Sequence, residues 1–396
     1  MKILVLSWEF PPRIVGGIAR HVGELYPEIV SLGHEVHLIT VEYGQCPHYE
    51  VVEGIYVHRV AADPHNDFFN WISSLNESMA KQGSKLLAED PDFDLIHAHD
   101  WLVGDAAIIL KHNFKVPLIA TIHATEFGRH NGIHTSIQEY ISGKERTLAH
   151  EAWRVIVCTE YMRREVNQVL RTPWDKIDVI FNGIRAEKKI PDANFDFWGF
   201  RRQFAHDHEK IVYYVGRMTY EKGVTVLLSA APKVIAEMGG NVKFVLIGGG
   251  NTEELKHKAS YLGIWQSCYF TGFMPDRDLD KFQTVADCAV FPSLYEPFGI
   301  VALESFASRV PVVVSDTCGL PEVVQHNKTG IVTQTNNPES LAWGILEILK
   351  NPSYGNWLVE NAYADLATRF TWEGISKQTE AVYQQVAGER SQVDWS

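Results

Sequence analysis

Short apolar runs recur along the chain, and segments in which apolar residues return at helical spacing separate most of them. The runs are rich in Val, Ile, Leu and Phe, as buried parallel strands are. They cover residues 2–8, 35–41, 55–60, 94–99, 116–122, 154–159 and 177–181, and then 211–216, 242–247, 267–271, 287–292 and 310–315. Strands and helices that alternate in this way predict an α/β protein with doubly wound sheets.

The alternation lapses over residues 186–209, a polar stretch that contains a proline. We interpret this stretch as the connection between two Rossmann-like domains, which we predict over residues 1–190 and 205–371. Each domain should place its functional loops at the carboxyl ends of its strands, so we expect a site in a cleft that the two domains face. The chain after Pro338 is expected to be helical, with a last helix over about 372–396 that packs back on the first domain.

Charge and composition exclude several classes of protein. The net charge is −13, and the halves on either side of Arg185 both contain more acidic than basic residues, which disfavours a nucleic-acid groove or a polybasic membrane surface. No apolar run approaches the ~20 residues of a membrane-spanning helix, although peripheral membrane contact stays open. Five cysteines without a C-x-x-C pair and an N-terminus without a cleavage site predict a cytoplasmic protein.

Two glycine clusters lie where a doubly wound sheet would bind a cofactor. Residues 9–17 read EFPPRIVGG and residues 248–253 read GGGNTE, and neither supplies the third glycine of the dinucleotide fingerprint G-x-G-x-x-G. A nicotinamide or flavin enzyme is therefore disfavoured. Gly16 and Gly17 precede a predicted helix, so they either bring backbone N–H groups against an anion or form a tight strand-to-helix turn.

A histidine motif ends one of the first-domain strands. In LIHAHDW, residues 95–101, strand alternation places His97 and His99 on one face, with Asp100 leaving the strand. This set plus His123, from ATIHATEFGRHNG, could ligate zinc, but no H-E-x-x-H pattern accompanies it. We expect no bound metal, with His97 in ordinary packing.

Another acidic pattern, DPDFD at residues 90–94, has the Asp-x-Asp spacing of metal-binding sugar transferases of another architecture. It precedes its strand and so lies at the wrong end of a parallel sheet for ligand binding. We interpret it as a solvated turn.

Two cations leave the first strand of the second domain. In VGRMTYEKG, Arg217 and Lys222 lie just before a helix that opens at Gly223. A planar guanidinium and an ammonium at this place form a plausible clamp for a pyrophosphate. The alternative is a pair of surface charges.

Two glutamates flank a helix start in SLYEPFGIVALES, residues 293–305. Pro297 disfavours helical geometry at Glu296, so Glu296 should lie ahead of the helix while Glu304 lies on it. The free N–H groups of the helix start suit a pyrophosphate, and each carboxylate can accept hydrogen bonds from hydroxyls, as a nucleotide sugar would offer. Exposed glutamates favoured by the helix dipole would explain Glu296 but not the partly apolar setting of Glu304.

These motifs together resemble a retaining glycosyltransferase of family 4 with a GT-B fold, similar to bacterial glycogen synthases and sucrose-synthase-like enzymes. The resemblance implies transfer of a hexosyl group from a UDP-sugar or ADP-sugar, with UDP-glucose first, to a hydroxyl of a saccharide acceptor in polysaccharide or glycoconjugate synthesis. It implies no divalent metal and no other cofactor. The glycogen-synthase loop K-T-G-G-L-G reads RIVGGIARH here, without its lysine, and this departure counts against ADP-glucose and an α-glucan acceptor.

The resemblance also implies roles for single residues. The catalytic candidates are His123, Glu296, Arg217 and Lys222. The candidates for binding the donor are Gly16, Gly17, Gly216, Arg217, Lys222, Phe273, Met274, Glu296, Phe298, Gly299, Ile300, Val301 and Glu304. The acceptor-side candidates are His99, Asp100, His130 and Asn131.

No second carboxylate emerges as a nucleophile, so the resemblance implies front-face attack with the departing phosphate as base. Arg217 and Lys222 would neutralise the diphosphate, Glu296 would orient the sugar, and Glu304 would hold the ribose. Two other functions stay open: a sugar-nucleotide epimerase of the same fold, which needs no acceptor, and a nucleotide-sugar-binding protein without turnover.

Overall fold

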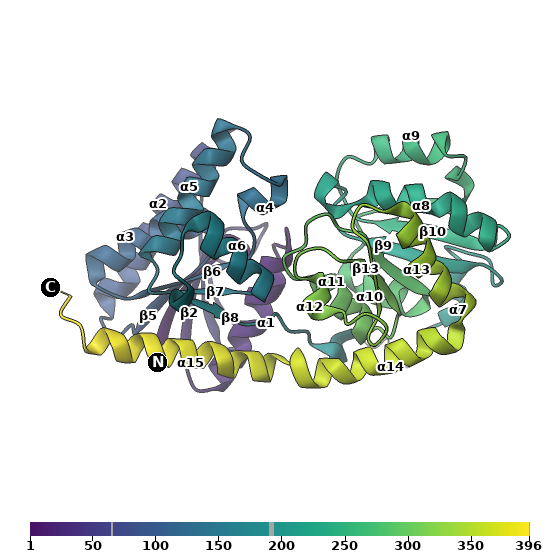
Figure 1. The fold of residues 1–396 in the computed structure, drawn as a ribbon. Coiled ribbons are helices and arrows are strands. Elements are labelled where there is room, and N and C mark those ends of the chain that lie inside the picture. The colour runs from purple at the N-terminus through teal and green to yellow at the C-terminus, as the bar shows by residue number, and fades with distance from the viewer. Residues whose placement is uncertain (65, 190–193, 396) are drawn as a thin grey trace. The chain divides into compact units, whose positions relative to one another are not determined.

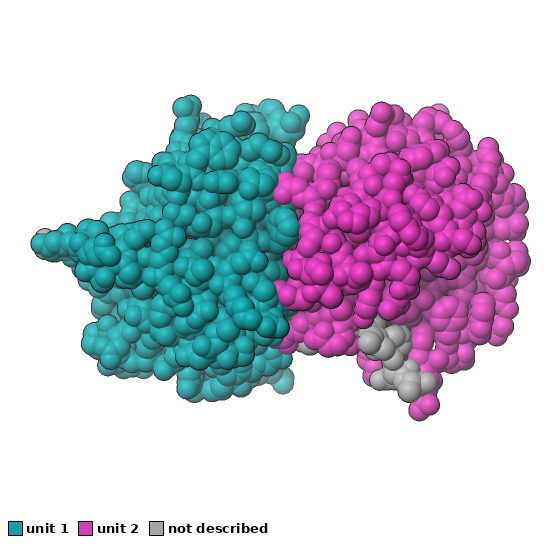
Figure 2. All heavy atoms as spheres, turned by 60° about the horizontal axis from the view of Figure 1, so that its bottom comes forward, with its two compact units in different colours: residues 1–183, 372–396 teal, residues 184–371 magenta. Residues whose placement is uncertain are grey.

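The computed structural model describes residues 1–64, 66–189 and 194–395, and its contacts divide them into two compact units (Figure 1). Unit 1 comprises residues 1–183 and 372–396, and unit 2 comprises residues 184–371, as coloured in Figure 2. The connection expected between the domains includes residues 190–193, which lie outside the described residues.

Unit 1 is built on a sheet whose described part has eight strands in the order β3-β4-β2-β1-β5-β6-β7-β8. The pairs are parallel except for β3 against β4, which is antiparallel. The strands are β1 (Lys2–Leu6), β2 (Glu35–Val41), β3 (Tyr49–Val52), β4 (Ile55–Val60), β5 (Leu95–His99), β6 (Leu118–Ile122), β7 (Arg154–Val157) and β8 (Ile177–Val179). All the apolar runs predicted here as strands are confirmed to within a few residues.

The sequence interpretation missed β3. This short edge strand alternates exposed and half-buried residues, so it lacks the continuous apolar run by which the other strands were recognised. It is joined to β4 by a turn in which Glu53 and Gly54 both have positive φ, 47° and 84°. A two-residue turn of this kind is typical of a β-hairpin, but the prediction of strands from apolar runs did not use this signal.

The helices of unit 1 follow the strands. They are α1 (Gly17–Ser31), α2 (Phe68–Glu89), α3 (Gly104–Phe114), α4 (Glu126–His130), α5 (Ser136–Glu151), α6 (Glu160–Leu170) and α15 (Trp372–Ser391), with short 3₁₀ helices at Trp101–Val103 and Trp174–Lys176. Side-chain caps fix several starts; Thr135 and Gln138, for example, form a reciprocal capping box at α5.

The C-terminal helix α15 shares its apolar face with α1 and the middle of the sheet. Ile3 of β1, Tyr26 of α1 and Ile375 and Tyr383 of α15 are buried in one cluster. A buried side chain of this size stabilises the fold by about 1.5–3 kcal/mol relative to exposure. The last segment of the chain is therefore part of the core of unit 1.

Unit 2 contains a parallel sheet in the order β11-β10-β9-β12-β13-β14 within the described residues. Its strands are β9 (Lys210–Val215), β10 (Val242–Ile247), β11 (Cys268–Gly272), β12 (Cys288–Phe291), β13 (Val312–Ser315) and β14 (Ile331–Thr333). The predicted strands are again confirmed, and β14, which has three residues, was missed because so short a run has no clear period.

The helices of unit 2 are α7 (Phe197–Arg201), α8 (Val224–Glu237), α9 (Glu253–Tyr261), α10 (Asp276–Val285), α11 (Ile300–Ala307), α12 (Leu320–Val323), α13 (Pro338–Lys350) and α14 (Pro352–Arg369). Short 3₁₀ helices cover Ala186–Lys189, Tyr220–Lys222 and Trp265–Ser267. The helical tail predicted after Pro338 is confirmed. No helix in the described part of the chain combines the length and apolar character that crossing a membrane requires.

The DPDFD segment lies at the amino end of β5, as predicted. Asp94 Oδ2 accepts the backbone N–H of Lys2 at 2.7 Å, and the ammonium of Lys2 pairs with Asp90. These carboxylates fix a turn beside the start of β1, away from the loops that follow the strands.

Two loops of unit 2 meet at Gly223, which precedes α8. Gly223 has a φ of 67°, and a Cβ atom on it would lie 1.9 Å from the carbonyl oxygen of Pro292, which follows β12. Only glycine allows both this backbone conformation and this approach. The contact holds the loop after β9 against the loop after β12.

We expect Gly223→Ala to destabilise the protein by about 1–2 kcal/mol for the positive φ and by a further ~1–3 kcal/mol for the clash. The matched control is Gly239→Ala, where φ is 60° but the nearest side-chain atom would be 3.9 Å away. Urea unfolding of both variants measures the difference, and equal losses would contradict a role for the contact with Pro292.

Candidate active site

The candidate residues of unit 2 lie in loops at the carboxyl ends of its strands or in helix α11, which follows one of these loops. Arg217 follows β9, and its side chain is 58% exposed, with Nη2 donating to Glu221 Oε1 at 3.2 Å. The hydroxyl of Tyr214 donates to the backbone carbonyl of Arg217 at 2.8 Å. The guanidinium is therefore tethered at its base but open to a ligand.

The structure brings Lys222 and Glu296 into direct contact. Lys222 Nζ donates to Glu296 Oε2 at 2.7 Å, and both side chains are largely buried, 20% and 13% exposed. The backbone supports the pair, because the N–H of Leu294 donates to the carbonyl of Glu221 at 2.8 Å. Two catalytic candidates from different loops thus form an ion pair, a contact that the sequence interpretation did not include.

Helix α11 begins at Ile300, with Gly299 as its N-cap at a φ of 103°. Glu296 precedes the helix and Glu304 lies on it, which confirms the predicted placement, and Glu304 is buried. Phe298 and Gly299 are also buried, whereas Ile300 and Val301, in the first turn of the helix, are half-buried. The backbone N–H groups in the first turn of a helix have no partner within the helix and suit a phosphate.

The other donor-side candidates of unit 2 are also loop residues. Gly216 directly follows β9, between Tyr214 and Arg217. Phe273 and Met274 follow β11, which lies at the edge of the sheet, and the ring of Phe273 is 80% exposed. An aromatic ring this open to solvent offers a stacking face for a planar ligand.

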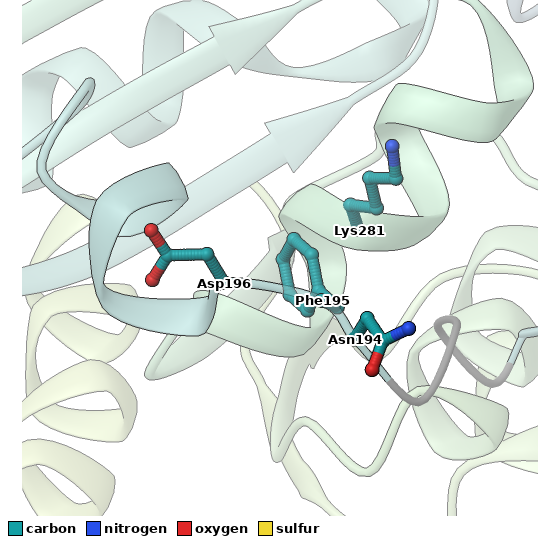
Figure 3. Close-up of a pocket in the computed structure, with 4 residues that line it drawn as sticks. All are labelled: Asn194, Phe195, Asp196 and Lys281. Atoms are coloured by element: carbon teal, nitrogen blue, oxygen red, sulfur yellow. The ribbon is translucent and has the colours of Figure 1, made fainter.

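Figure 3 shows a hollow of unit 2 that contains no candidate residue. Asn194, Phe195, Asp196 and Lys281 line it, and its volume is about 530 Å³. Asp196 accepts the N–H of Gly199 at 2.9 Å and so caps α7. The residues that line this hollow therefore include a structural cap, and we assign it no part in the site.

In unit 1, His97 and His99 face the same way, as strand alternation predicts, and their rings stack 4.5 Å apart. His97 is fully engaged, since Nε2 lies 2.8 Å from Thr121 Oγ1 and Nδ1 lies 2.7 Å from the hydroxyl of Tyr383. The hydroxyl of Tyr26 bridges the two rings, 3.0 Å from His97 Nδ1 and 2.7 Å from His99 Nε2. His97 thus has the packing role expected for it.

His99 and His123 meet at the carboxyl ends of β5 and β6. His99 Nδ1 lies 3.1 Å from His123 Nε2. The ring of His21, on α1, lies 5.3 Å from that of His99 and 4.9 Å from that of His123. Sequence reasoning missed His21, although its place four residues after Gly17 on the buried face of α1 was a signal.

Burial keeps these imidazoles neutral. It lowers the pKa of His21 and of His123 to about 3, and it lowers the pKa of His97 and of His99 well below the usual range. The positive charges of neighbouring imidazoles and of Arg129 act in the same direction. At neutral pH these rings can donate or accept hydrogen bonds but carry no charge.

Asp100 is held in an unusual backbone conformation, with φ 61° and ψ 170°. Its Oδ1 accepts the backbone N–H of His123 at 2.8 Å, and burial raises its pKa to about 6. Strain of this kind costs about 1–3 kcal/mol and concentrates at functional sites. Asp100 therefore fixes the backbone that presents His123.

His130 and Asn131, the other acceptor-side candidates, end the short helix α4. Both are exposed, and His130 Nε2 lies 3.2 Å from Glu126 Oε1. They follow His123 at the same edge of the sheet.

The glycine loop of unit 1 contains a carboxylate that the sequence analysis did not single out. Glu9 Oε2 accepts the backbone N–H groups of Val15 and of Gly16, each at 2.8 Å. Glu9 is buried, and burial raises its pKa. This loop does bring N–H groups against an anion, and in the structure that anion is an internal glutamate; Gly17 begins α1 beside it.

A two-domain arrangement of Rossmann-like sheets with functional loops after the strands defines the GT-B class of glycosyltransferases. A family model described as Glycosyltransferase Family 4 matches residues 15–188, and one described as Glycosyl transferases group 1 matches residues 196–365. An uncharacterized glycosyltransferase of Methanocaldococcus jannaschii is 38% identical over 97% of this chain and 98% of its own. The glycogen synthase of Mycobacterium tuberculosis is 32% identical, over 97% and 94%. The chain belongs to the glycosyltransferase family that includes these relatives.

Solved structures agree on the fold. The sucrose-phosphate synthase of Thermosynechococcus elongatus superposes with a TM-score of 0.82 at 22% identity, over 98% of this chain and 99% of that one. Anabaena HepE in complex with UDP-glucose gives a TM-score of 0.77 at 21% identity, over 99% and 100%. The catalytic domain of Arabidopsis thaliana starch synthase IV, bound to ADP and acarbose, gives 0.77 at 17% identity, over 98% and 99%.

A buried acid lies next to helix α4, at the carboxyl edge of the sheet of unit 1. Glu145 of α5 is 1% exposed and accepts the N–H of Glu126 through Oε1 at 2.8 Å. Burial raises its pKa from an ordinary value of 4.5 to about 8, and the charge of Asp100 adds to the rise. Glu145 is therefore protonated in the folded protein at neutral pH and ionised in the unfolded chain.

Because the pKa of Glu145 is higher in the folded state, its contribution to stability is present below pH 4.5 and is lost as the pH rises towards 8. Each pH unit in this window should cost about 1.4 kcal/mol. We expect Glu145→Gln to remove this slope, so that the variant gains stability on wild type from pH 5 to pH 8. Urea unfolding at several pH values measures it. The exposed control Glu139→Gln on the same helix should follow wild type, and parallel curves for Glu145→Gln would contradict the prediction.

Proposed function

We propose that this protein is a retaining glycosyltransferase that moves a glucosyl group from UDP-glucose to a hydroxyl of a saccharide acceptor without a metal ion. The observation that carries the proposal is the Lys222–Glu296 pair ahead of α11, with the exposed guanidinium of Arg217 on the same loop as Lys222. The complex of Anabaena HepE with UDP-glucose supports the choice of donor. An ADP-sugar is the second choice, because starch synthase IV binds ADP.

The proposed donor would place its diphosphate at the start of α11. Arg217 would bind the phosphates as a planar fork and Lys222 as a point charge. As the bond to the anomeric carbon breaks, negative charge grows on the leaving phosphate, so these cations and the N–H groups of α11 would stabilise the transition state more than the ground state. Two cations placed in this way make a divalent ion unnecessary.

Glu296 would orient the sugar and not attack it. Its carboxylate is paired with an ammonium at 2.7 Å, which weakens it as a nucleophile while leaving Oε1 to accept a sugar hydroxyl. Glu304 would accept the ribose hydroxyls. The proposal includes no covalent intermediate: the departing phosphate would take the acceptor proton on the face that it leaves, and the configuration would be retained.

His123 would act as a neutral hydrogen-bonding group beside the reacting centre. Its low pKa excludes an imidazolium at neutral pH, and Asp100 fixes its backbone. Unit 1 would bind the acceptor through the loops that contain His99, His130 and Asn131.

We expect Arg217→Ala or Lys222→Ala to lower kcat roughly 10²- to 10³-fold, or by about 3–4 kcal/mol, with the donor still bound. Release of UDP at saturating donor measures turnover. Lys233→Ala is the matched control, because Lys233 is also a cation of unit 2 but pairs with Glu339 on the surface. Near-normal turnover in both test variants would refute the clamp.

We also expect UDP-glucose to raise the melting temperature more than ADP- or GDP-sugars, with and without EDTA, because a ligand that binds only the native state stabilises it. Transfer should continue in EDTA, and proton NMR of the first product should show an α linkage. Loss of activity in EDTA would contradict metal independence, and a β product would contradict retention. An epimerised sugar nucleotide formed without acceptor would point to an epimerase instead.

A further inference from the structure

Three imidazoles of unit 1 converge at the carboxyl edge of its sheet. His21 comes from α1, His99 from the end of β5, and His123 from the loop after β6. One ring nitrogen of each lies within 4.8 Å of the other two, and His99 Nδ1 and His123 Nε2 are 3.1 Å apart. This is the one such group of potential metal ligands among residues 1–64, 66–189 and 194–395.

The hydrogen bonds around His21 leave one of its nitrogens ready to act as a ligand. Nδ1 lies 2.7 Å from Asn182 Oδ1, and because an amide oxygen only accepts, the proton is on Nδ1 and the lone pair on Nε2. His21 is 6% exposed, and its Nε2 is buried without a hydrogen-bond partner. An unsatisfied buried nitrogen is costly, so its position calls for a partner.

His99 has a comparable arrangement. Its Nε2 lies 2.7 Å from the hydroxyl of Tyr26. In the tautomer that donates Nε2–H to the Tyr26 oxygen, the lone pair lies on Nδ1, which faces His123. Histidines that bind metals typically donate their second N–H to an outer oxygen in this way.

We propose that His21 Nε2, His99 Nδ1 and His123 Nε2 bind one divalent transition ion of the zinc class. Three neutral imidazoles without a carboxylate favour Zn²⁺, Co²⁺, Ni²⁺ or Cu²⁺ over Mg²⁺ and Ca²⁺. Bonds of ~2.0–2.1 Å in a tetrahedral site place ligand nitrogens roughly 3.3 Å apart. His99 Nδ1 and His123 Nε2 are already near this spacing at 3.1 Å. In the metal-free protein the proton between them is on His123 Nε2, and on binding it would move to the other ring nitrogen of His123. The three ligand nitrogens lie within 4.8 Å of one another, so they have to close by about 1.5 Å at most.

The ion would leave a fourth position for water, with Asn182 and Tyr26 as outer partners of the ligands. Because His123 would be a ligand of the ion, it could no longer take part in the transfer reaction. Binding of the ion would therefore inhibit transfer. This inhibition rests on the proposed function, whereas binding of the ion does not.

The test is a titration of the metal-free full chain with Co²⁺. We expect one equivalent to produce the visible absorption of tetrahedral Co²⁺ and Zn²⁺ to displace it. His21→Ala should abolish the absorption. His37→Ala is the matched control, because His37 Nδ1 and His58 Nε2 form another imidazole pair in unit 1, 3.2 Å apart, and it should bind as wild type does. Asn182→Ala should weaken binding about 10- to 100-fold.

His21→Cys guards against a variant that loses binding through misfolding. A thiolate at this position should bind Co²⁺ and add a sulfur-to-cobalt charge-transfer band in the near ultraviolet, which only a direct ligand can produce. No saturable absorption in wild type, unchanged absorption in His21→Ala, or no such band in His21→Cys would overturn the proposal. Zn²⁺ inhibition of transfer, reversed by EDTA, reports the coupling to the reaction; a chain without transferase activity would refute the proposed function and leave the Co²⁺ titration readable.

Discussion

Parallel strand pairing is the constraint on which the rest of the structure depends. A parallel pair needs a crossover to return the chain, so the parallel strands of a sheet all place their following loops at the same edge. In unit 2 this edge gathers the loops after β9, β11 and β12, and in unit 1 it gathers those after β1, β5 and β6. Residues far apart in the chain become neighbours, and one glycine, Gly223, sets how closely two of these loops approach.

The two units treat charge in opposite ways. The site of unit 2 keeps its charges and pairs them, with Lys222 on Glu296 and Arg217 on Glu221. In unit 1 the groups of the site are buried, and burial keeps the imidazoles neutral and Glu145 protonated. A paired but partly open cation suits a diphosphate, whereas neutral imidazoles suit hydroxyls or a transition ion. The proposed reaction and the proposed metal site follow from this difference.

Most of the fold and part of the site could be predicted. The long apolar runs predicted strands correctly, because a parallel strand that is buried on both faces has apolar residues at nearly every position. Glu296 was correctly placed ahead of α11, because Pro297 restricts the backbone of the residue before it. The edge strand β3 and the short strand β14 were missed, because a half-exposed or very short strand has no clear hydrophobic pattern in the sequence. The roles given to single donor-side and acceptor-side residues stay predictions.

The sequence by itself determined where strands and helices form and which motifs follow them, because hydrophobic period, proline and glycine act over a few neighbouring residues. Only the tertiary structure decided which of those motifs touch. Lys222 reaches Glu296 across 74 positions, and His21 reaches Asn182 across 161. The carboxylate of Glu9 on the amide of Gly16, and the meeting of His21 with His99 and His123, depend on how whole strands and helices pack. No local pattern encodes such contacts, since packing brings together side chains whose neighbours in sequence lie elsewhere.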